Sequence, residues 1–495
     1  MYHHFVRVEC VKGEELEEFY RDFHAFFPKP PQRKKQTDKP LVNVLLLGLD
    51  SLSRLNMIRT MPLTLNFIQN TLKGIPMFGY NKIGLNTFPN LIPLLTGYTE
   101  EGLLRACWGS QTAHLDLCPW IWDKFAAKGY RTAYMEDSPT MALFTYKRSG
   151  FAIQRTDYDA STMFIPATND LSNENTYCLG ARNQIQLLLN YTLKQVRAMN
   201  RYHENFITFS WGVTLSHELI NEPQQADPLY HSLLRTFQDE EILNNTFLIF
   251  LSDHGLRFGD FLLSEQGRIE GKLPALFFVA PDWFRHKYSS AMRNLRDNQN
   301  RLLTTLDIHA TLLDLADLSQ IEDEVIAARS NNIKTEEKGI SLFLPLPDNR
   351  SCQEASIPEE FCSCEHLKEV DVSLPEVGRV AQFIVDEINY RILRNHSLCV
   401  PRTLVSVHEA AVGPPLIKSD ENDKIVEYEV TAFVDPGNAL FSAVVRHFTS
   451  NESLRVVGEV SRLDKYGKQS QCMSKYSLLP FCFCKDPNQV AKPSP

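Results

Sequence analysis

The chain of 495 residues has no run of 18 apolar residues, so the sequence predicts no membrane-spanning helix. It has no basic cluster longer than Arg33-Lys34-Lys35 and a formal net charge of -9, which argues against nucleic acid as a partner. Its first residues, MYHHFVRVECVKGEELEEFY, lack the apolar stretch of a signal peptide. A hydrophobic content of 43% and a charged content of 22% are ordinary for a globular protein, and the length implies two or more domains.

Cysteine, by contrast, is plentiful, with 11 residues, and its spacing repeats along the chain. Two triplets share the pattern C-x9-C-x-C: Cys352, Cys362 and Cys364, and then Cys472, Cys482 and Cys484. Most zinc sites need C-x2-4-C pairs, and C-x-C is tighter than that, so the spacing favours disulfides over zinc. We expect each triplet to lie at a disulfide, and these bridges to tie the two ends of the C-terminal part together.

Disulfides form in oxidising compartments, so the sequence predicts an extracellular protein or one of the secretory-pathway lumen. Five N-glycosylation sequons add weak support to this location: Asn190, Asn244, Asn349, Asn395 and Asn451. A signal peptide, which such a location requires, is missing from the first residues. We expect the N-terminus to be truncated, or an alternative start to have removed a leader or a membrane anchor.

Changes of composition predict three parts. Residues 1–39 form an N-terminal segment with a proline- and charge-rich linker, PKPPQRKKQTDKP, at residues 28–40. Residues 40–346 form the core. Residues 347–495 are expected to form a smaller, disulfide-tied α+β domain, with one helix at residues 370–391 and the strand-like runs EYEVTAFV and LFSAVVRHF.

The core is predicted to be α/β, with a largely parallel sheet between helices, because strand-like and helix-like segments alternate along it. The predicted strands are residues 42–49, 130–135, 206–209, 247–251 and 276–280. The predicted helices are residues 120–128, 180–199 and 301–315.

Two acids and an imidazole follow predicted strands of this core. The stretch FLSDHGLRFGD places Asp253 and His254 after a buried strand, and Asp50 follows the run VNVLLLGL. Ligands of open α/β sheets bind at the carboxyl ends of the strands, and a buried carboxylate is costly unless it is paired, hydrogen-bonded or metal-bound. Two structural alternatives stay open: an ordinary turn at Asp253, and a capping role for Asp50.

Thr87 and His217 belong to the same edge of the predicted sheet. Thr87 precedes Pro89 in LNTFPNLIPLLTG, so it lies at or just before the N-terminus of a short helix that ends at Gly97. It could cap that helix, or it could serve as a nucleophile where the helix attracts an anion. His217 follows the predicted strand 206–209 in a polar loop, where it could be a ligand or an ordinary loop residue.

Carboxylate oxygen and imidazole nitrogen are ligands that suit zinc or manganese. A divalent metal at this edge would neutralise an oxygen of a bound phosphate or sulfate and lower the pKa of a nearby hydroxyl. The residue set therefore predicts phosphoryl or sulfuryl transfer through a covalent intermediate.

The order Asp50, Thr87, His217, Asp253-His254-Gly255 resembles the alkaline phosphatase and sulfatase superfamily. The segments KFAAKGYRTAYMED and TTLDIHATLLDLADL, the latter followed by GISLF, are similar to two more parts of its core, over about residues 40–346. LLLGLDSLSR, NTFPNLIPLLTG and SDHGLRFG, with the two cysteine triplets, more narrowly resemble an animal domain-of-unknown-function family of sulfatase-like proteins over nearly the whole chain.

This resemblance implies an alkaline-phosphatase-like core and a role for each matching residue. Asp50, Asp253 and His254 would hold one divalent metal, with Thr87 as a further ligand and as the nucleophile. His217 would belong to a second metal or to substrate binding. The implied substrate is a small-molecule, glycan or lipid phosphoester.

The sequence also departs from the superfamily pattern. Sulfatases have Cys-x-Pro-x-Arg at the nucleophile, whereas Thr87-Phe88-Pro89-Asn90-Leu91 has neither the Cys nor the Arg. Sulfatases begin with paired acids, whereas Asp50 is followed by Ser51. Two-metal members carry another His soon after the Asp-His pair, but the next one here is His286. A one-metal phosphotransferase therefore fits better than a two-metal enzyme.

Three functions remain open. The first is a metal-dependent phosphoric-ester hydrolase or phosphotransferase with a threonine nucleophile, and the second is an extracellular non-catalytic binding protein on the same fold. A sulfuric-ester hydrolase is the weakest of the three, because a threonine cannot become formylglycine.

Overall fold

The computed structural model describes residues 5–13, 17–31, 41–139, 141–170, 178–332, 339–364, 367–393, 398–413, 416–417, 424–473, 478–486, 488 and 490. The predicted linker, residues 28–40, lies outside these ranges from residue 32 onward. The chain divides into two units, which are described separately: Met1–Leu256 with Ile269–Ile357, and Arg257–Arg268 with Pro358–Pro495. Among the helices of the described ranges, none has the length and hydropathy needed to cross a bilayer.

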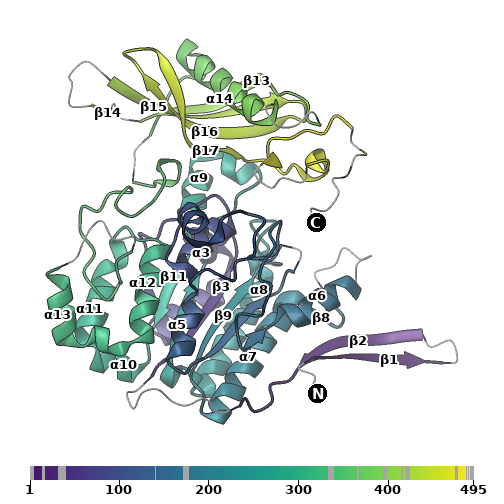
Figure 1. The fold of residues 1–495 in the computed structure, drawn as a ribbon, viewed down its shortest axis with the longest axis vertical. Coiled ribbons are helices and arrows are strands. Elements are labelled where there is room, and N and C mark those ends of the chain that lie inside the picture. Colours follow the sequence, from purple (N-terminus) through teal and green to yellow (C-terminus); the bar gives the residue numbers. More distant parts are fainter. Residues whose placement is uncertain are drawn as a thin grey trace. The chain divides into compact units, whose positions relative to one another are not determined.

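The first unit is built on a seven-stranded sheet (Figure 1). Its strands, in spatial order, are β4 (Ile75–Pro76), β11 (Leu276–Val279), β10 (Thr246–Leu251), β3 (Asn43–Leu49), β9 (Phe206–Gly212), β5 (Arg131–Glu136) and β6 (Tyr158–Asp159). The neighbours from β10 to β6 are all parallel, and β11 is antiparallel to both of its neighbours. The predicted α/β class and the largely parallel sheet are confirmed.

Strand β3 lies in the middle of this sheet because both of its faces are apolar. All seven of its residues are buried. Val44 and Leu46 point into one hydrophobic cluster, whereas Leu45, Leu47 and Leu49 point into the other. A parallel strand that is covered on both faces needs such an uninterrupted apolar run.

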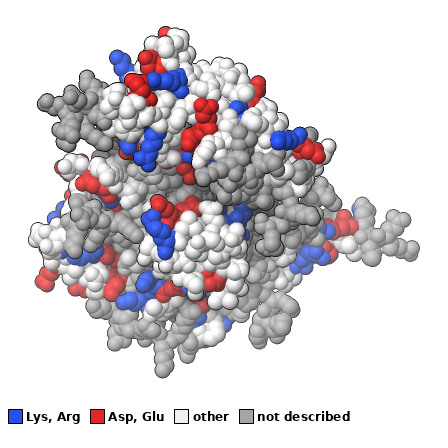
Figure 2. Space-filling model, turned by 45° about the horizontal axis from the view of Figure 1, so that its top comes forward, with Lys and Arg blue, Asp and Glu red and all other residues white. Residues whose placement is uncertain are grey.

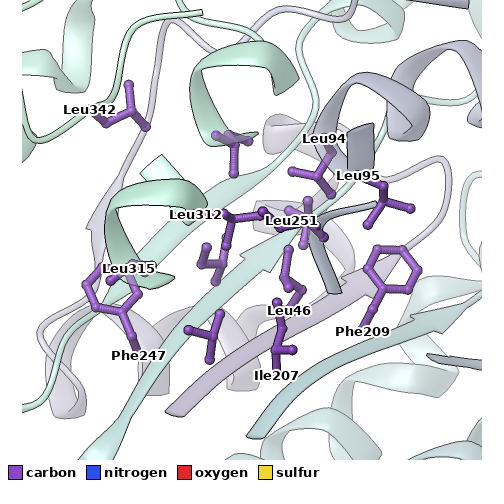
Figure 3. Packing of buried hydrophobic residues seen from close by; sticks show 14 of the residues in the cluster. Leu46, Leu94, Leu95, Ile207, Phe209, Phe247, Leu251, Leu312, Leu315 and Leu342 are labelled. Carbon is purple, nitrogen blue, oxygen red and sulfur yellow. The ribbon is translucent and has the colours of Figure 1, made fainter. Parts of the chain in front are cut away.

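Helices cover the two faces of the sheet (Figure 1). The face of Leu46 packs against α3 (Thr87–Thr96), α5 (Ile121–Ala127) and α12 (Thr305–Ala316), and Figure 3 shows Leu94, Leu95, Leu312 and Leu315 packed against β3, β9 and β10. The remaining helices with residues in this unit are α1 (Arg54–Thr60), α2 (Pro62–Asn66), α4 (Glu100–Leu103), α6 (Ser161–Asp170), α7 (Gln184–Tyr202), α8 (Pro223–Asp239), α9 (Glu265–Lys272), α10 (Asp282–Lys287), α11 (Ser289–Asp297) and α13 (Asp323–Ser330).

An antiparallel ribbon of β1 (Phe5–Lys12) and β2 (Glu17–Ala25) precedes the core. It lies in the segment that the sequence analysis treated only as an N-terminal extension and linker. Arg182 donates two hydrogen bonds to Asp22 Oδ1, at 2.9 and 3.1 Å, and so links the ribbon to the short hairpin β7 (Cys178–Leu179) and β8 (Arg182–Asn183).

The second unit is a six-stranded antiparallel sheet with one long helix, α14 (Pro375–Leu393). Its strands are β12 (Lys368–Glu369), β13 (Thr403–Val412), β14 (Leu416–Ile417), β15 (Lys424–Asp435), β16 (Ala439–Phe448) and β17 (Ser453–Arg462). Ile384 of the helix shares a buried cluster with Val430 and Phe441 of the strands. The predicted α+β character of the C-terminal part is confirmed.

Disulfides occur at both cysteine triplets, as predicted. Cys472 bonds Cys484, and Cys482 bonds Cys399. Cys107 and Cys118 form a further bridge. Cys352 and Cys362 are the two disulfide-bonded cysteines that remain, so they bond each other. No bridge joins one triplet to the other, so the expectation that they tie the two ends of the domain was wrong. Cys472–Cys484 closes a loop of 12 residues, whereas Cys482 reaches back 83 residues to Cys399, just before β13.

Charged side chains of both signs are exposed. On the face drawn in Figure 2, acidic and basic residues are interspersed and do not gather into one patch of a single sign. This mixture accompanies the formal net charge of -9 for the whole chain.

Candidate functional site

The carboxyl ends of β3 and β10 bring together the acids that the sequence analysis selected. The two strands are parallel neighbours, with Leu47 opposite Phe250 and Gly48 opposite Leu251. Asp50 follows β3 immediately, and Asp253 follows β10 after one residue. Because adjacent parallel strands end at the same edge of a sheet, the two carboxylates meet there.

Three side chains form a tight group at this edge. Asp50, Asp253 and His254 each offer a ligand atom, and these atoms all lie within 4.8 Å of one another. All three side chains are buried, with 2%, 0% and 0% of their surfaces exposed. Burial, followed by repulsion from Asp50, raises the pKa of Asp253 well above its ordinary value. Two carboxylates that share a dry site in this way favour a cation between them.

The ring of His254 is oriented so that one nitrogen can act as a ligand. Its Nδ1 lies 2.8 Å from the carbonyl oxygen of Gly255, which can only accept, so Nδ1 carries the proton and Nε2 carries the lone pair. Nε2 lies 3.1 Å from Oδ2 of Asp253, and this buried oxygen accepts no hydrogen bond from the described residues. An imidazole lone pair that faces a carboxylate oxygen fits a divalent cation, so the donor set suits zinc or manganese.

Thr87 is the first residue of α3, and its hydroxyl points at the acid group. Thr87 Oγ1 donates a hydrogen bond to Asp50 Oδ2 at 2.9 Å. Asn86 occupies the N-cap position, so Thr87 is not the cap that the sequence allowed. Asn90 ties the preceding loop to the helix, because its side chain accepts from the backbone N–H groups of Ile83 and Gly84, at 2.8 and 3.0 Å. The start of α3 is therefore held in place beside the acids.

His217 is not part of the group within 4.8 Å. It lies in the loop after β9, half-buried, with Nδ1 at 2.8 Å from Glu218 Oε1. Asp137, at the end of β5, holds the start of this loop by accepting hydrogen bonds from the backbone N–H of Val213, at 2.7 Å, and from the hydroxyl of Thr214, at 2.6 Å. A role for His217 in a second metal site or in substrate binding stays a prediction.

Ser51 is a member of the site that sequence reasoning missed. Its hydroxyl donates to Asp50 Oδ1 at 2.6 Å and lies 3.5 Å from His254 Nδ1, and its backbone N–H donates to Asp253 Oδ1 at 3.1 Å. It therefore contacts all three members of the group. Its φ of 56° is in the left-handed region, which non-glycine residues seldom adopt and which is often found at functional sites. The sequence showed it only as the residue in place of a second acid.

A second layer of residues supports the turns that carry the acids. Tyr80 donates to the carbonyl of Ser252 at 3.1 Å. Glu270 is buried and accepts hydrogen bonds from Ser53 Oγ, at 2.7 Å, and from Arg59 Nη1, at 2.9 Å. These contacts connect the segments after β3 and β10 to the helices beside them. The sequence does not indicate these contacts, because the residues that form them are far apart along the chain.

A family model described as "Protein of unknown function (DUF229)" matches residues 2–408 of the chain. No curated protein matches.

Solved structures are similar to the chain at low identity. One is a protein in the alkaline phosphatase superfamily from Vibrio parahaemolyticus, at 12% identity and a TM-score of 0.43, covering 86% of this chain and 83% of that one. Another is the C-terminal periplasmic domain of EcEptC from Escherichia coli in complex with Zn, at 13% identity and a TM-score of 0.38, covering 67% and 93%. A third is the lipoteichoic acid synthase LtaP from Listeria monocytogenes, at 14% identity and a TM-score of 0.36, covering 56% and 72%.

Proposed function

This chain belongs to the DUF229 family, and we propose that it is a metal-dependent phosphoric-ester hydrolase or phosphotransferase with Thr87 as the nucleophile. The observation that carries the proposal is the hydrogen bond of 2.9 Å from the Thr87 hydroxyl to Asp50, beside the buried carboxylate of Asp253 and the ring of His254. A hydroxyl, two acids and an imidazole at a helix N-terminus form the set that such chemistry needs.

The proposed metal ligands are Asp50, Asp253, His254 and Thr87. Three of them are buried, and Asp253 Oδ2 lacks a hydrogen-bond donor, so a divalent cation would satisfy charges that the described protein leaves uncompensated. A zinc or manganese ion held there would withdraw electron density from the threonine hydroxyl and from the ester oxygens. A second metal near His217 is not needed for this scheme.

The proposed reaction passes through a phosphothreonine. Thr87 Oγ1 attacks the phosphorus, the bond from phosphorus to the leaving oxygen breaks, and the hydroxyl proton, held towards Asp50 Oδ2 at the start, ends on the leaving group. Water or an acceptor hydroxyl then attacks the phosphorus, the bond from phosphorus to Thr87 Oγ1 breaks, and the proton of the attacking hydroxyl restores the threonine hydroxyl. The N-terminus of α3 contributes positive potential beside the crowded ester oxygens.

Phosphoric esters are favoured over sulfuric esters because position 87 is a threonine. A threonine cannot become the formylglycine that sulfatases form from a cysteine, so position 87 offers a hydroxyl as the nucleophile. We further infer an oxidising compartment, extracellular or luminal, from eight disulfide-bonded cysteines.

The test is turnover of generic phosphate mono- and diesters by the full chain, with the metal content measured on the same sample. Thr87→Ala should lower turnover on the order of a thousandfold or more, and Thr87→Ser should keep part of it. Mass spectrometry of the wild type, quenched in acid during turnover, should find phosphate on the peptide that contains Thr87. Thr236→Ala is the matched control, because its hydroxyl only bonds the carbonyl of Ser232 on an exposed part of α8.

Two outcomes would reject the proposal. Thr87→Ala that turns over phosphoesters at the wild-type rate would exclude the nucleophile, and a wild type that cleaves aryl sulfates alone would make the chain a sulfatase. A wild type that retains metal but cleaves neither class would favour the alternative of a non-catalytic extracellular binding protein. Loss of metal in Asp253→Asn, with the fold intact, would support the ligand set under either function.

A further inference from the structure

A cavity of about 270 Å³ lies in the first unit beside the edge strand β6. Three aromatic side chains and two carboxylates line most of it: Phe5, Tyr158, Tyr191, Asp157 and Asp159. The other lining residues that the structure describes are uncharged, and no Lys, Arg or His is among the described ones. None of these residues belongs to the site at the ends of β3 and β10. In the described part of its lining, the cavity therefore combines aromatic walls with negative charge and no basic side chain.

The aromatic wall is held rigidly by packing. Phe5 stacks on Tyr191, with ring centroids 5.7 Å apart and planes inclined by 21°. Phe27, which does not line the cavity, packs edge-on against Tyr158 and Tyr191 at 5.4 and 4.9 Å. Tyr158 and Tyr191 are buried. Aromatic faces carry negative potential and attract cations, most strongly where water is excluded.

Asp159 supplies a carboxylate oxygen for a ligand. Both of its hydrogen bonds, from the backbone N–H of Ser161 at 2.9 Å and from its hydroxyl at 2.5 Å, go to Oδ1. No hydrogen bond or ion pair from the described residues reaches Oδ2. Burial raises the pKa of Asp159, as expected for a carboxylate that no basic side chain compensates.

The second carboxylate has a different role. Asp157 Oδ2 accepts hydrogen bonds from the backbone N–H and the hydroxyl of Thr132, at 2.9 and 3.1 Å, and Arg131 Nη1 lies 3.9 Å from Oδ1. Asp157 therefore fastens β5 to the loop before β6. Asp159 is the acid that remains for a ligand in the cavity.

We propose that this cavity binds a small organic cation, a quaternary ammonium or protonated amine, between the aromatic rings and Asp159. An anion would meet two carboxylates, and an uncharged apolar molecule would shield the half-buried Asp159 Oδ2 from water without offering it a partner. A cation satisfies both walls of the cavity at once, through the ring faces and through the carboxylate. The proposal is independent of the chemistry assigned to Thr87.

The test is isothermal titration of the full chain with choline, with ethanolamine, and with 3,3-dimethylbutan-1-ol, which is the uncharged isostere of choline. The cations should bind, and the isostere should bind about tenfold more weakly or not at all. Asp159→Asn should weaken the binding of the cations by about tenfold, whereas Tyr191→Phe, which keeps the ring, should retain it. Asp239→Asn, an exposed acid at the end of α8, is the matched control and should have no effect.

Equal affinity for choline and its isostere would overturn the proposal, because it would show that charge is not recognised. Unchanged affinity in Asp159→Asn would overturn it too, as would no binding of either cation at millimolar concentration. Circular dichroism of Asp159→Asn checks that the fold is kept. The comparison of choline with its isostere uses the wild-type chain and needs no variant.

Discussion

Gly255 follows the Asp-His pair, and its lack of a side chain is required by close packing. A Cβ at this position would lie 2.3 Å from the carbonyl oxygen of Glu270 and 3.0 Å from Cα of Gly271. Side-chain carbons do not approach backbone oxygen below about 3.0 Å, so Gly255→Ala needs a displacement of about 0.7 Å (3.0 minus 2.3). The backbone that would have to move also accepts a hydrogen bond from Gly255, because the N–H of Gly255 donates to the carbonyl oxygen of Gly271 at 3.2 Å.

This displacement is resisted on the other side of the contact. The Glu270 side chain is held by Ser53 and Arg59, so the helix cannot retreat without straining those bonds. Overpacking of this kind costs about 1–3 kcal/mol. If Gly255 moves instead, the neighbouring His254 moves with it. Loss of a contact that supports a metal ligand lowers metal affinity by about 10–100-fold. We therefore expect Gly255→Ala to lower zinc affinity by about that factor.

Thermal unfolding of the metal-free chain and competition for zinc with a chelator measure the two effects. Gly378→Ala is the matched control, because Gly378 lies in α14 with no heavy atom within 4 Å of an added Cβ. The same change there should stabilise the helix by about 0.5–1 kcal/mol and leave zinc affinity unchanged. A Gly255→Ala chain with wild-type stability and wild-type zinc affinity would refute the reasoning from packing.

Three more outcomes are expected. Ser51→Ala, which removes the hydroxyl that bonds Asp50, should lower zinc affinity by about 10–100-fold in the same competition, and an unchanged affinity would contradict its positioning role. Burial raises the pKa of Asp137 from 3.8 to about 6. Between these pH values the folded protein therefore binds more protons than the unfolded chain, so the free energy of unfolding falls as pH rises through this window, by about 3 kcal/mol in all. Asp137→Asn removes that contribution, so its destabilisation in urea titrations should be smaller at pH 7 than at pH 4, and an equal effect at both would contradict it. Arg350 donates two hydrogen bonds to the buried Asp307, at 2.8 and 3.0 Å. Arg350→Met leaves this carboxylate without its cation and should destabilise the first unit by about 3–5 kcal/mol. A loss below about 1 kcal/mol would rule out this contribution.

The central strands could be predicted because their apolar runs are long and end in polar residues. The predicted strand 42–49 differs from β3 by one residue at its start, and the predicted strand 247–251 differs from β10 in the same way. Helix starts were less accurate. The helix predicted at 370–391 begins at Pro375, because a proline fits the first turn, whose N–H groups have no partner within the helix. The helix predicted from residue 180 begins at Gln184, because Asn183 caps it.

The N-terminal ribbon has only a short pattern in the sequence. Residues Val6 to Glu9 of β1 alternate apolar and polar side chains, which is typical of a strand, but Val6 and Val8 are exposed and do not form a covered face. The domain limits placed at residues 39 and 346 stay a prediction.

The sequence indicated the acids of the candidate site, but not the residues that hold those acids in place. Asp50, Asp253 and His254 could be selected because each follows a buried strand, but their convergence depends on β3 and β10 being neighbours, which no local pattern states. Ser51 could not be selected, because its contacts arise from a left-handed backbone that its sequence does not require. Thr87 could be selected from the helix start alone. No comparable signal decides the role of His217.

Different parts of the first unit hold the proposed metal ligands and the loop that carries His217, which we expect to influence the choice of ester. The proposed ligands are held by the most buried parts of the first unit, since β3 and β10 have both faces covered and α3 is packed through Leu94 and Leu95. The loop that carries His217 is anchored at its start by Asp137 and by the buried Val213 and Leu215, and at its end by Asn56 Nδ2, which donates to the carbonyl of Ile220 at 2.8 Å. Between these anchors Leu219 is exposed. Core substitutions should therefore weaken metal binding and turnover together, whereas changes in this loop should alter which ester is accepted while the metal stays bound. This difference follows from packing, because a covered strand cannot shift without opening a cavity, whereas the exposed stretch between the two anchors of the loop can.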